Sequence, residues 1–129
     1  MNDSSAPICV KGISSQIVVP DVVNTAEYYR DIYGFTIEGY FLDPPVYSIV
    51  SRNGFQIHFG RSDGNELRLN RSIRKGSFDL YIVVSDIDRM LAQLREKNAE
   101  ILEGVVKRIY GSREITTRDC NGHIVTFGD

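Results

Sequence analysis

The sequence contains no tryptophan and only two cysteines, Cys9 and Cys120. These cysteines lie far apart and match neither a redox pair nor a metal-binding spacing, so the sequence offers no cysteine chemistry. No stretch approaches the ~18 apolar residues of a membrane-spanning helix. The opening residues also lack the charged-then-apolar order of a secretion signal. We therefore expect a soluble, cytoplasmic protein that needs no disulfide to fold.

A basic surface is missing as well. Fifteen Lys and Arg residues stand against seventeen Asp and Glu residues, which gives a net charge of −2. No basic stripe is interleaved with aromatic residues, so we expect no nucleic-acid partner. The local run of Arg68, Arg71, Arg74 and Lys75 is interpreted as a solvated loop. The motifs of phosphate-binding loops, dinucleotide sites and nucleophile elbows are also absent.

The chain is 129 residues long, which suits a single domain, and 42% of its residues are apolar, which suffices for a core. Within it, the sequence repeats itself. Residues 17–22 resemble residues 82–87, and residues 53–60 resemble residues 121–128. The two matched pairs occur in the same order and at nearly the same offset. We conclude that the chain is an internal duplication, with repeat one at 13–60, a connector at 61–76 and repeat two at 77–129.

Each repeat predicts a strand, a helix and three further strands. Apolar residues alternate over 13–19 and 78–84, as in half-buried strands. Helices should follow, opened by capping boxes at Asn24 with Glu27 and at Ser85 with Asp88, and ended by Gly34 and by Asn98. The remaining strands are expected at 35–41, 46–51, 55–60, 100–106, 113–118 and 123–128. The predicted fold class is therefore α+β, built from two βαβββ repeats.

Several short motifs stand out in this pattern. They are Val19-Pro20-Asp21, Tyr28-Tyr29-Arg30-Asp31-Ile32-Tyr33-Gly34-Phe35, Val84-Ser85-Asp86, Tyr110-Gly111-Ser112-Arg113 and Arg118-Asp119-Cys120-Asn121-Gly122-His123. Together they resemble the motifs of the vicinal oxygen chelate superfamily. Cys120 replaces the usual proline. The superfamily includes glyoxalase I, extradiol dioxygenases, fosfomycin-inactivating transferases and bleomycin-binding resistance proteins. The resemblance implies curved mixed sheets around a central cleft, and a homodimer.

The resemblance also places the positions that bind a metal in such proteins. One lies seven residues before the Asp that ends the first strand of each repeat, which is Ser14 or Asp79. The other lies two residues before the Gly that ends the fourth strand, which is His58 or Thr126. Hydroxyls are poor ligands for a divalent ion. Only His58 and Asp79 are good ligands, so no metal cofactor is expected, although a divalent metal stays possible.

Strand alternation predicts which side chains face the cleft. Phe55, Ile57 and Phe59 should share the helix-facing side, and Gln56 and His58 the other. His58 and Asp79 could pair as a structural hydrogen bond, or Asp79 could orient His58 as a general base. The full set of expected ligand-binding residues is Ser14, Gln16, Tyr47, Gln56, His58, Asp79, Tyr81, Arg113 and Thr126.

Arg113 has two interpretations, a contact to an anion or carbonyl and a surface strand charge. For the whole protein, the incomplete ligand set favours a small-molecule-binding protein of the bleomycin resistance type. The alternative is a metal-dependent lyase or dioxygenase that uses His58 and Asp79. A purely structural interaction domain is the third possibility. In each case we expect no membrane partner.

Overall fold

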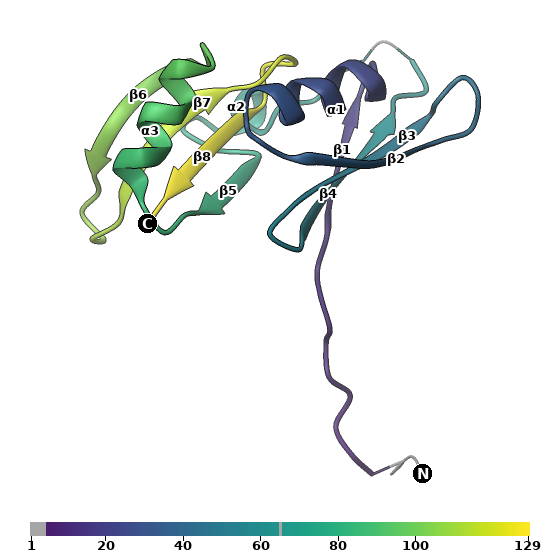
Figure 1. The fold of residues 1–129 in the computed structure, drawn as a ribbon, viewed down its shortest axis with the longest axis horizontal. Coiled ribbons are helices and arrows are strands. Elements are labelled where there is room, and N and C mark those ends of the chain that lie inside the picture. The colour runs from purple at the N-terminus through teal and green to yellow at the C-terminus, as the bar shows by residue number, and fades with distance from the viewer. Residues whose placement is uncertain (1–4, 65) are drawn as a thin grey trace.

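The computed structural model describes residues 5–64 and 66–129 and contains two halves of equal architecture (Figure 1). The first half consists of β1 (Ser15–Val19), α1 (Val22–Asp31), β2 (Thr36–Phe41), β3 (Tyr47–Arg52) and β4 (Phe55–Arg61). The second consists of β5 (Leu80–Val83), α3 (Ile87–Glu96), β6 (Glu100–Lys107), β7 (Arg113–Arg118) and β8 (Ile124–Gly128). A single helical turn, α2 (Asn70–Ile73), lies in the connector. The duplicated βαβββ order predicted from the sequence is confirmed.

Each half forms one mixed four-stranded sheet with the same strand order. The orders are β1-β4-β3-β2 and β5-β8-β7-β6. The first and fourth strands of each half pair in parallel, whereas the other pairs are antiparallel. Consequently β1 and β5 are both outer strands. The two sheets stay separate and do not close into a barrel.

The helices begin at the aspartates of the repeated Val-x-Asp motif. The Asp21 carboxylate accepts hydrogen bonds from the amides of Val23 and Asn24, both at 3.0 Å. Asp86 caps α3 in the same way through the amide of Arg89 at 3.1 Å. The predicted capping boxes were therefore wrong, because α1 is capped three residues earlier than predicted, at Asp21 instead of Asn24, and α3 one residue later, at Asp86 instead of Ser85.

The residues predicted to stop the helices have a left-handed backbone and follow the helix ends, Gly34 three residues after α1 and Asn98 two residues after α3. Gly34 has a φ of 76° and Asn98 a φ of 60°. This conformation is easy for glycine and tolerated by asparagine. The two halves therefore use different residues for the same stop.

The core lies between the helices and the sheets, and α1 also joins the two halves. Phe59 and Phe127, on the equivalent strands β4 and β8, are almost fully buried. Tyr33, in the turn that follows α1, bonds Thr117 Oγ1 on β7 at 2.8 Å, and Tyr29 Oη on α1 donates to Asp119 Oδ2 at 2.7 Å. Burial and the nearby Asp119 carboxylate raise the pKa of Tyr29. These buried hydrogen bonds fix one repeat against the other.

Candidate functional site

Each sheet has one apolar side, which packs on the helices, and one polar side. On β4, Ile57 and Phe59 are buried in the core while Gln56 and His58 point the other way. The predicted alternation on this strand is confirmed. We call the polar side of the first sheet the first polar face, and it is formed by Ser14, Gln16, Tyr47, Gln56 and His58.

A continuous chain of hydrogen bonds connects the first polar face. Gln16 Nε2 donates to Tyr47 Oη at 2.9 Å, and Tyr47 Oη lies 2.8 Å from His58 Nδ1. His58 Nε2 lies 3.0 Å from Gln56 Oε1, which also accepts a 3.5 Å bond from Ser14 Oγ. If each group donates to the next, the His58 hydrogen is on Nε2. The sequence prediction therefore brought together five residues that are in mutual contact.

Aromatic rings border this network. The Tyr47 ring meets the His58 ring edge-on, with centroids 5.5 Å apart, and it meets the Phe41 ring at 6.0 Å. Phe41 is exposed. The first polar face therefore combines aromatic rings with ordered amide and imidazole groups.

The second sheet carries a corresponding set of side chains, the second polar face, formed by Tyr81, Glu103, Glu114, Thr116 and Thr126. Glu114 is only 4% exposed. Its carboxylate accepts bonds from Tyr81 Oη at 2.7 Å, Tyr110 Oη at 2.8 Å and Arg108 Nε at 3.0 Å. Burial opposes ionisation, but these bonds outweigh it and lower the pKa of Glu114.

Glu114 is a residue that the sequence analysis missed, and the repeat explains its place. Tyr47 pairs with Gly60 in the first half, and Glu114 pairs with Gly128 in the second. The contact between Gln16 and Tyr47 therefore recurs as the contact between Tyr81 and Glu114. The two halves build one geometry with different chemistry, a network of amide, phenol and imidazole groups in the first and a carboxylate-centred one in the second. Extending the repeat register to the third strand would have identified Glu114.

Arg113 does not belong to either polar face. Its guanidinium binds the Asp88 carboxylate on α3, at 2.8 and 3.2 Å. Because side chains alternate along β7, Arg113 shares the helix side with the fully buried Ile115. This pairing with Asp88 favours the interpretation of Arg113 as a surface strand charge, and a ligand contact by Arg113 stays a prediction.

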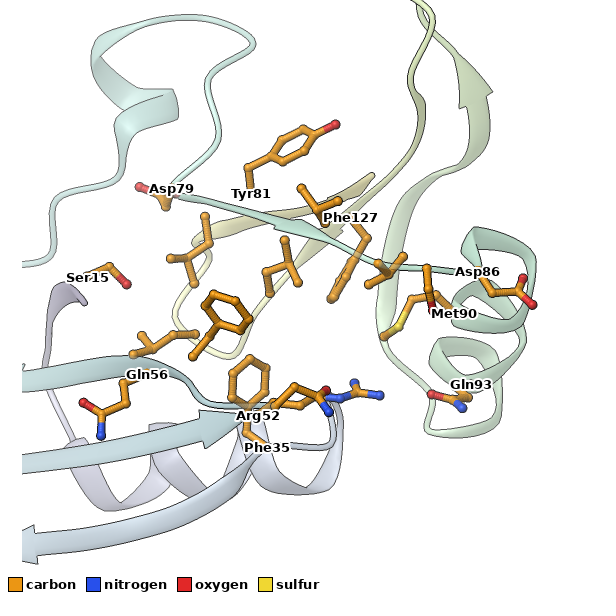
Figure 2. A pocket seen from close by; sticks show the side chains of 18 of the residues that line it. Ser15, Phe35, Arg52, Gln56, Asp79, Tyr81, Asp86, Met90, Gln93 and Phe127 are labelled. Carbon is orange, nitrogen blue, oxygen red and sulfur yellow. The ribbon is translucent and has the colours of Figure 1, made fainter. Parts of the chain in front are cut away.

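A cleft of about 850 Å³ separates the two halves (Figure 2). Apolar side chains from both repeats line it, among them Phe35, Phe55, Leu80, Met90 and Phe127. Of the nine predicted ligand-binding residues, Gln56, Asp79 and Tyr81 lie along it, and Tyr81 points away from these apolar side chains (Figure 2). Ser14, His58 and Thr126 do not line this cleft, so the cleft between the two halves of one chain is not a hollow shared by Ser14, His58, Asp79 and Thr126.

The sequence matches the family model of the Glyoxalase/Bleomycin resistance protein/Dioxygenase superfamily over residues 12–127. The chain belongs to this superfamily. The match covers both repeats and the connector between them. No curated protein sequence matches the chain.

Solved structures with the glyoxalase/bleomycin resistance fold are similar to this chain. TioX from Micromonospora sp. ML1 is 16% identical, with a TM-score of 0.73 over 92% of this chain and 98% of that one. A bleomycin-binding protein complexed with bleomycin is 14% identical, with a TM-score of 0.73 over 93% and 98%. A virulence protein of Salmonella typhimurium is 20% identical, with a TM-score of 0.68 over 95% and 98%. These likenesses concern the fold alone.

At the positions that bind a metal in the superfamily, the side chains of this chain either already make hydrogen bonds within the protein or are weak metal ligands. Asp79 accepts the amide of Asn70 through Oδ1 at 3.1 Å and the amide of Ile124 through Oδ2 at 2.9 Å. His58 uses both ring nitrogens in the first polar face. The predicted pair between His58 and Asp79 is therefore wrong, because Asp79 lies beside the connector and ties it to β8.

The remaining positions, Ser14 and Thr126, offer only neutral hydroxyls. Across residues 5–64 and 66–129, the structure has no group of three or more His, Cys, Asp or Glu side chains placed to hold a metal ion. Catalytic metal sites normally need three such ligands. The donor set of this chain thus does not fit the divalent metal of its metal-dependent relatives.

Across residues 5–64 and 66–129, no helix is long and apolar enough to cross a membrane.

Proposed function

We propose that this superfamily member binds a small amphipathic organic molecule on the first polar face, without a metal cofactor. One observation carries the proposal. It is the ordered hydrogen-bond network on the neighbouring strands β1, β4 and β3, formed by Gln16, Gln56, His58 and Tyr47. Rigid strands hold these groups in place, so a ligand meets preorganised donors and acceptors. A metal-dependent lyase or dioxygenase is the competing function.

The chemistry of the face indicates the kind of ligand. Two primary amides and an imidazole suit hydrogen bonds to carbonyl, hydroxyl or amide groups. The Phe41 and Tyr47 rings suit a planar or apolar portion of the same molecule. The similar structure of a bleomycin-binding protein with bleomycin makes bleomycin a reasonable first probe.

The proposal includes a homodimer that acts in the cytoplasm. Outer strands β1 and β5 each leave one edge without a partner strand within residues 5–64 and 66–129, which favours association. A second copy would also cover the first polar face, which a single chain leaves partly open. Both cysteines are free and exposed, which suits a reducing compartment.

Calorimetric titration tests the binding function. The ligands would be bleomycin and a panel of planar aromatic amides and phenols. We expect at least one to bind, and His58→Ala to weaken its binding roughly tenfold, the effect of losing one hydrogen bond of about 1.4 kcal/mol. Arg113→Gln is the matched control, because Arg113 lies on the helix side. Equal loss in both variants, or no binding by any compound, would contradict the proposal.

Metal analysis separates the two candidate functions. Protein purified without chelator should contain no stoichiometric zinc, nickel, manganese or iron. One metal ion per chain would instead support the lyase or dioxygenase function, and would require the donors described above to rearrange.

A further inference from the structure

The loop between β2 and β3 contains a backbone conformation that its own sequence does not favour. Leu42, the first residue of this loop, has a φ of 70°. Elsewhere in the part of the chain that the structure describes, every residue with a positive φ is a glycine or an asparagine. Those two residue types adopt a left-handed backbone easily, whereas the Cβ of leucine is forced against a neighbouring carbonyl oxygen. The chain therefore has leucine at a position where glycine or asparagine would be more stable.

Packing does not explain the leucine. The Leu42 side chain is 77% exposed, so burial in the core does not offset the strained backbone. Phe41, the residue before it, is also an exposed large apolar side chain, at 47%. A position that breaks a local rule without a gain in stability indicates a functional role for its side chain.

The two exposed residues lie at the edge of the first polar face. Phe41 is paired with Tyr47 across β2 and β3, and residues that are directly opposite share one side of a sheet. The ring of Tyr47 lies between the rings of Phe41 and His58, with centroid distances of 6.0 and 5.5 Å. A row of three rings thus leads across the face from His58 to Phe41. Leu42 follows directly after this row, and we call Phe41 and Leu42 the apolar rim.

The loop that carries the apolar rim is short and constrained. The amide of Val46 donates to the carbonyl oxygen of Phe41 at 3.0 Å and so closes the loop. Between them, Pro44 and Pro45 have φ angles that are fixed by their own rings. The rim is therefore held in place before a ligand arrives, which reduces the entropy lost on binding.

We propose that the apolar rim binds the apolar end of the ligand whose polar end lies on the first polar face. The ligand is then an elongated molecule, with a hydrogen-bonding head near His58 and Gln56, a flat middle along Tyr47 and an alkyl or aryl tail at Leu42. Leu42 selects for the tail, and the strain in its backbone is the cost of presenting that side chain. This inference rests on the proposed function and adds to it the class of ligand and a residue that determines specificity.

Two probes that differ only in the tail test the inference, benzamide and 4-butylbenzamide. Calorimetric titration measures the affinity of each for the full-length chain. Each methylene group that is removed from water strengthens binding by up to about fourfold. We therefore expect the parent chain to bind 4-butylbenzamide at least roughly tenfold more tightly than benzamide.

Leu42→Asn removes the apolar side chain and keeps a residue that tolerates the left-handed backbone. The ratio of the two affinities should decrease to below about threefold, while the affinity for benzamide is unchanged. Leu42→Met keeps an apolar side chain and should preserve the ratio. Ile73→Asn is the matched control, because Ile73 is 79% exposed but lies on α2 in the connector. This variant should also preserve the ratio.

Thermal unfolding separates a specificity role of Leu42 from a structural one. Leu42→Asn should raise the midpoint of unfolding by about 3 °C, because asparagine relieves the strained backbone. Stability and discrimination of the tail should therefore change in opposite directions in the same variant. A leucine that stabilised the loop would give a lower midpoint instead.

A lower midpoint, or a parent ratio that is close to one or is unaffected by Leu42→Asn, would overturn the inference. Benzamide binding that persists in these cases would leave the proposed function standing. If neither probe binds the parent chain, the inference is overturned, and the wider panel of compounds decides the proposed function separately.

Discussion

Two equivalent glycines in the last strands of the two halves face different surroundings. Gly60 ends the polar side of β4, and Gly128 has the same place on β8. A Cβ added at residue 128 would lie 2.1 Å from Tyr81 Oη, whereas one added at residue 60 would meet Tyr47 Cε1 at an ordinary 3.7 Å. Residue 128 must therefore be a glycine, because Tyr81 lies directly over it. At residue 60 the contact with Tyr47 does not require a glycine.

We expect Gly128→Ala to displace Tyr81 and to break its hydrogen bond to the buried Glu114 carboxylate. Losing a partner of a buried charged group costs about 1–3 kcal/mol. Urea denaturation should show this decrease in the free energy of unfolding. Gly60→Ala, the matched control, should change it by less than about 0.5 kcal/mol. Equal effects in the two variants would mean that the Tyr81 contact is not what requires the glycine.

A buried ion pair predicts how stability depends on pH. Burial alone would lower the pKa of His123, but Asp119 outweighs burial and raises it above the ordinary value of 6.5. His123 Nδ1 lies 3.6 Å from Asp119 Oδ2, and more distant Asp79 acts in the same direction. Protonated His123 thus stabilises the fold fully below its unfolded pKa, and this contribution disappears as pH rises through the raised pKa.

The free energy of unfolding should therefore decrease when the pH is raised from about 6 to about 9. Asp119 has a lowered pKa, so its own contribution is constant in this range and is lost only in acid. His123→Asn should flatten the dependence. A parent chain whose stability is unchanged or increases over the same range would contradict this assignment.

For single residues, the sequence predicted the side of the sheet on which a side chain lies better than it predicted the hydrogen-bond partner of that side chain. Alternation placed Gln16, Gln56 and His58 on the correct side, because the period of a strand is fixed. Alternation could not predict that the Asp79 carboxylate accepts hydrogen bonds from backbone amides and does not pair with His58. This choice of partner depends on how the connector lies against β8. Arg113 kept two interpretations because its side of the sheet follows only from the register of β7 against β8.

Among the helices and strands, the starts of α1 and α3 show what the repeated Val-x-Asp motif does in the structure. Asp21 and Asp86 occupy the same position in the two halves, and both cap the helix that follows. The resemblance drew attention to these aspartates as landmarks for the metal positions. In the structure their role is to satisfy amides at the start of a helix.

We expect Asp21→Ala to destabilise the protein by about 0.5–2 kcal/mol, the usual cost of losing a helix cap. Asn24→Ala should have little effect, because the Asn24 side chain does not cap α1. Thermal unfolding of both variants would measure the difference. A larger loss from Asn24→Ala than from Asp21→Ala would favour the capping box that the sequence suggested.

Most elements were predictable because their signals are local. Alternating apolar residues, Gly34 and Asn98 fixed the strands and the helix ends to within one or two residues. The α2 turn was not predicted, since the connector has no apolar period. The backbone amide of Asn70, the first residue of α2, donates a hydrogen bond to Asp79, which lies outside the connector.

In the whole molecule, one duplicated unit carries two different polar surfaces. The halves have the same strand order, and Tyr29 on α1 and Tyr33 in the turn after it fasten them together. Sequence comparison of the halves was sufficient to predict this architecture. It could not predict that the polar positions of the two halves lie apart within one chain, because the arrangement of repeats is not encoded in either repeat alone.

The central claim is that the first polar face binds a small organic molecule. The most direct measurement is nuclear magnetic resonance of isotopically labelled protein during titration with a library of small planar amphipathic compounds. We predict that the shifted signals cluster on β1, β3 and β4 around Tyr47 and His58. Shifts confined to other surfaces, or none with any compound, would contradict the account.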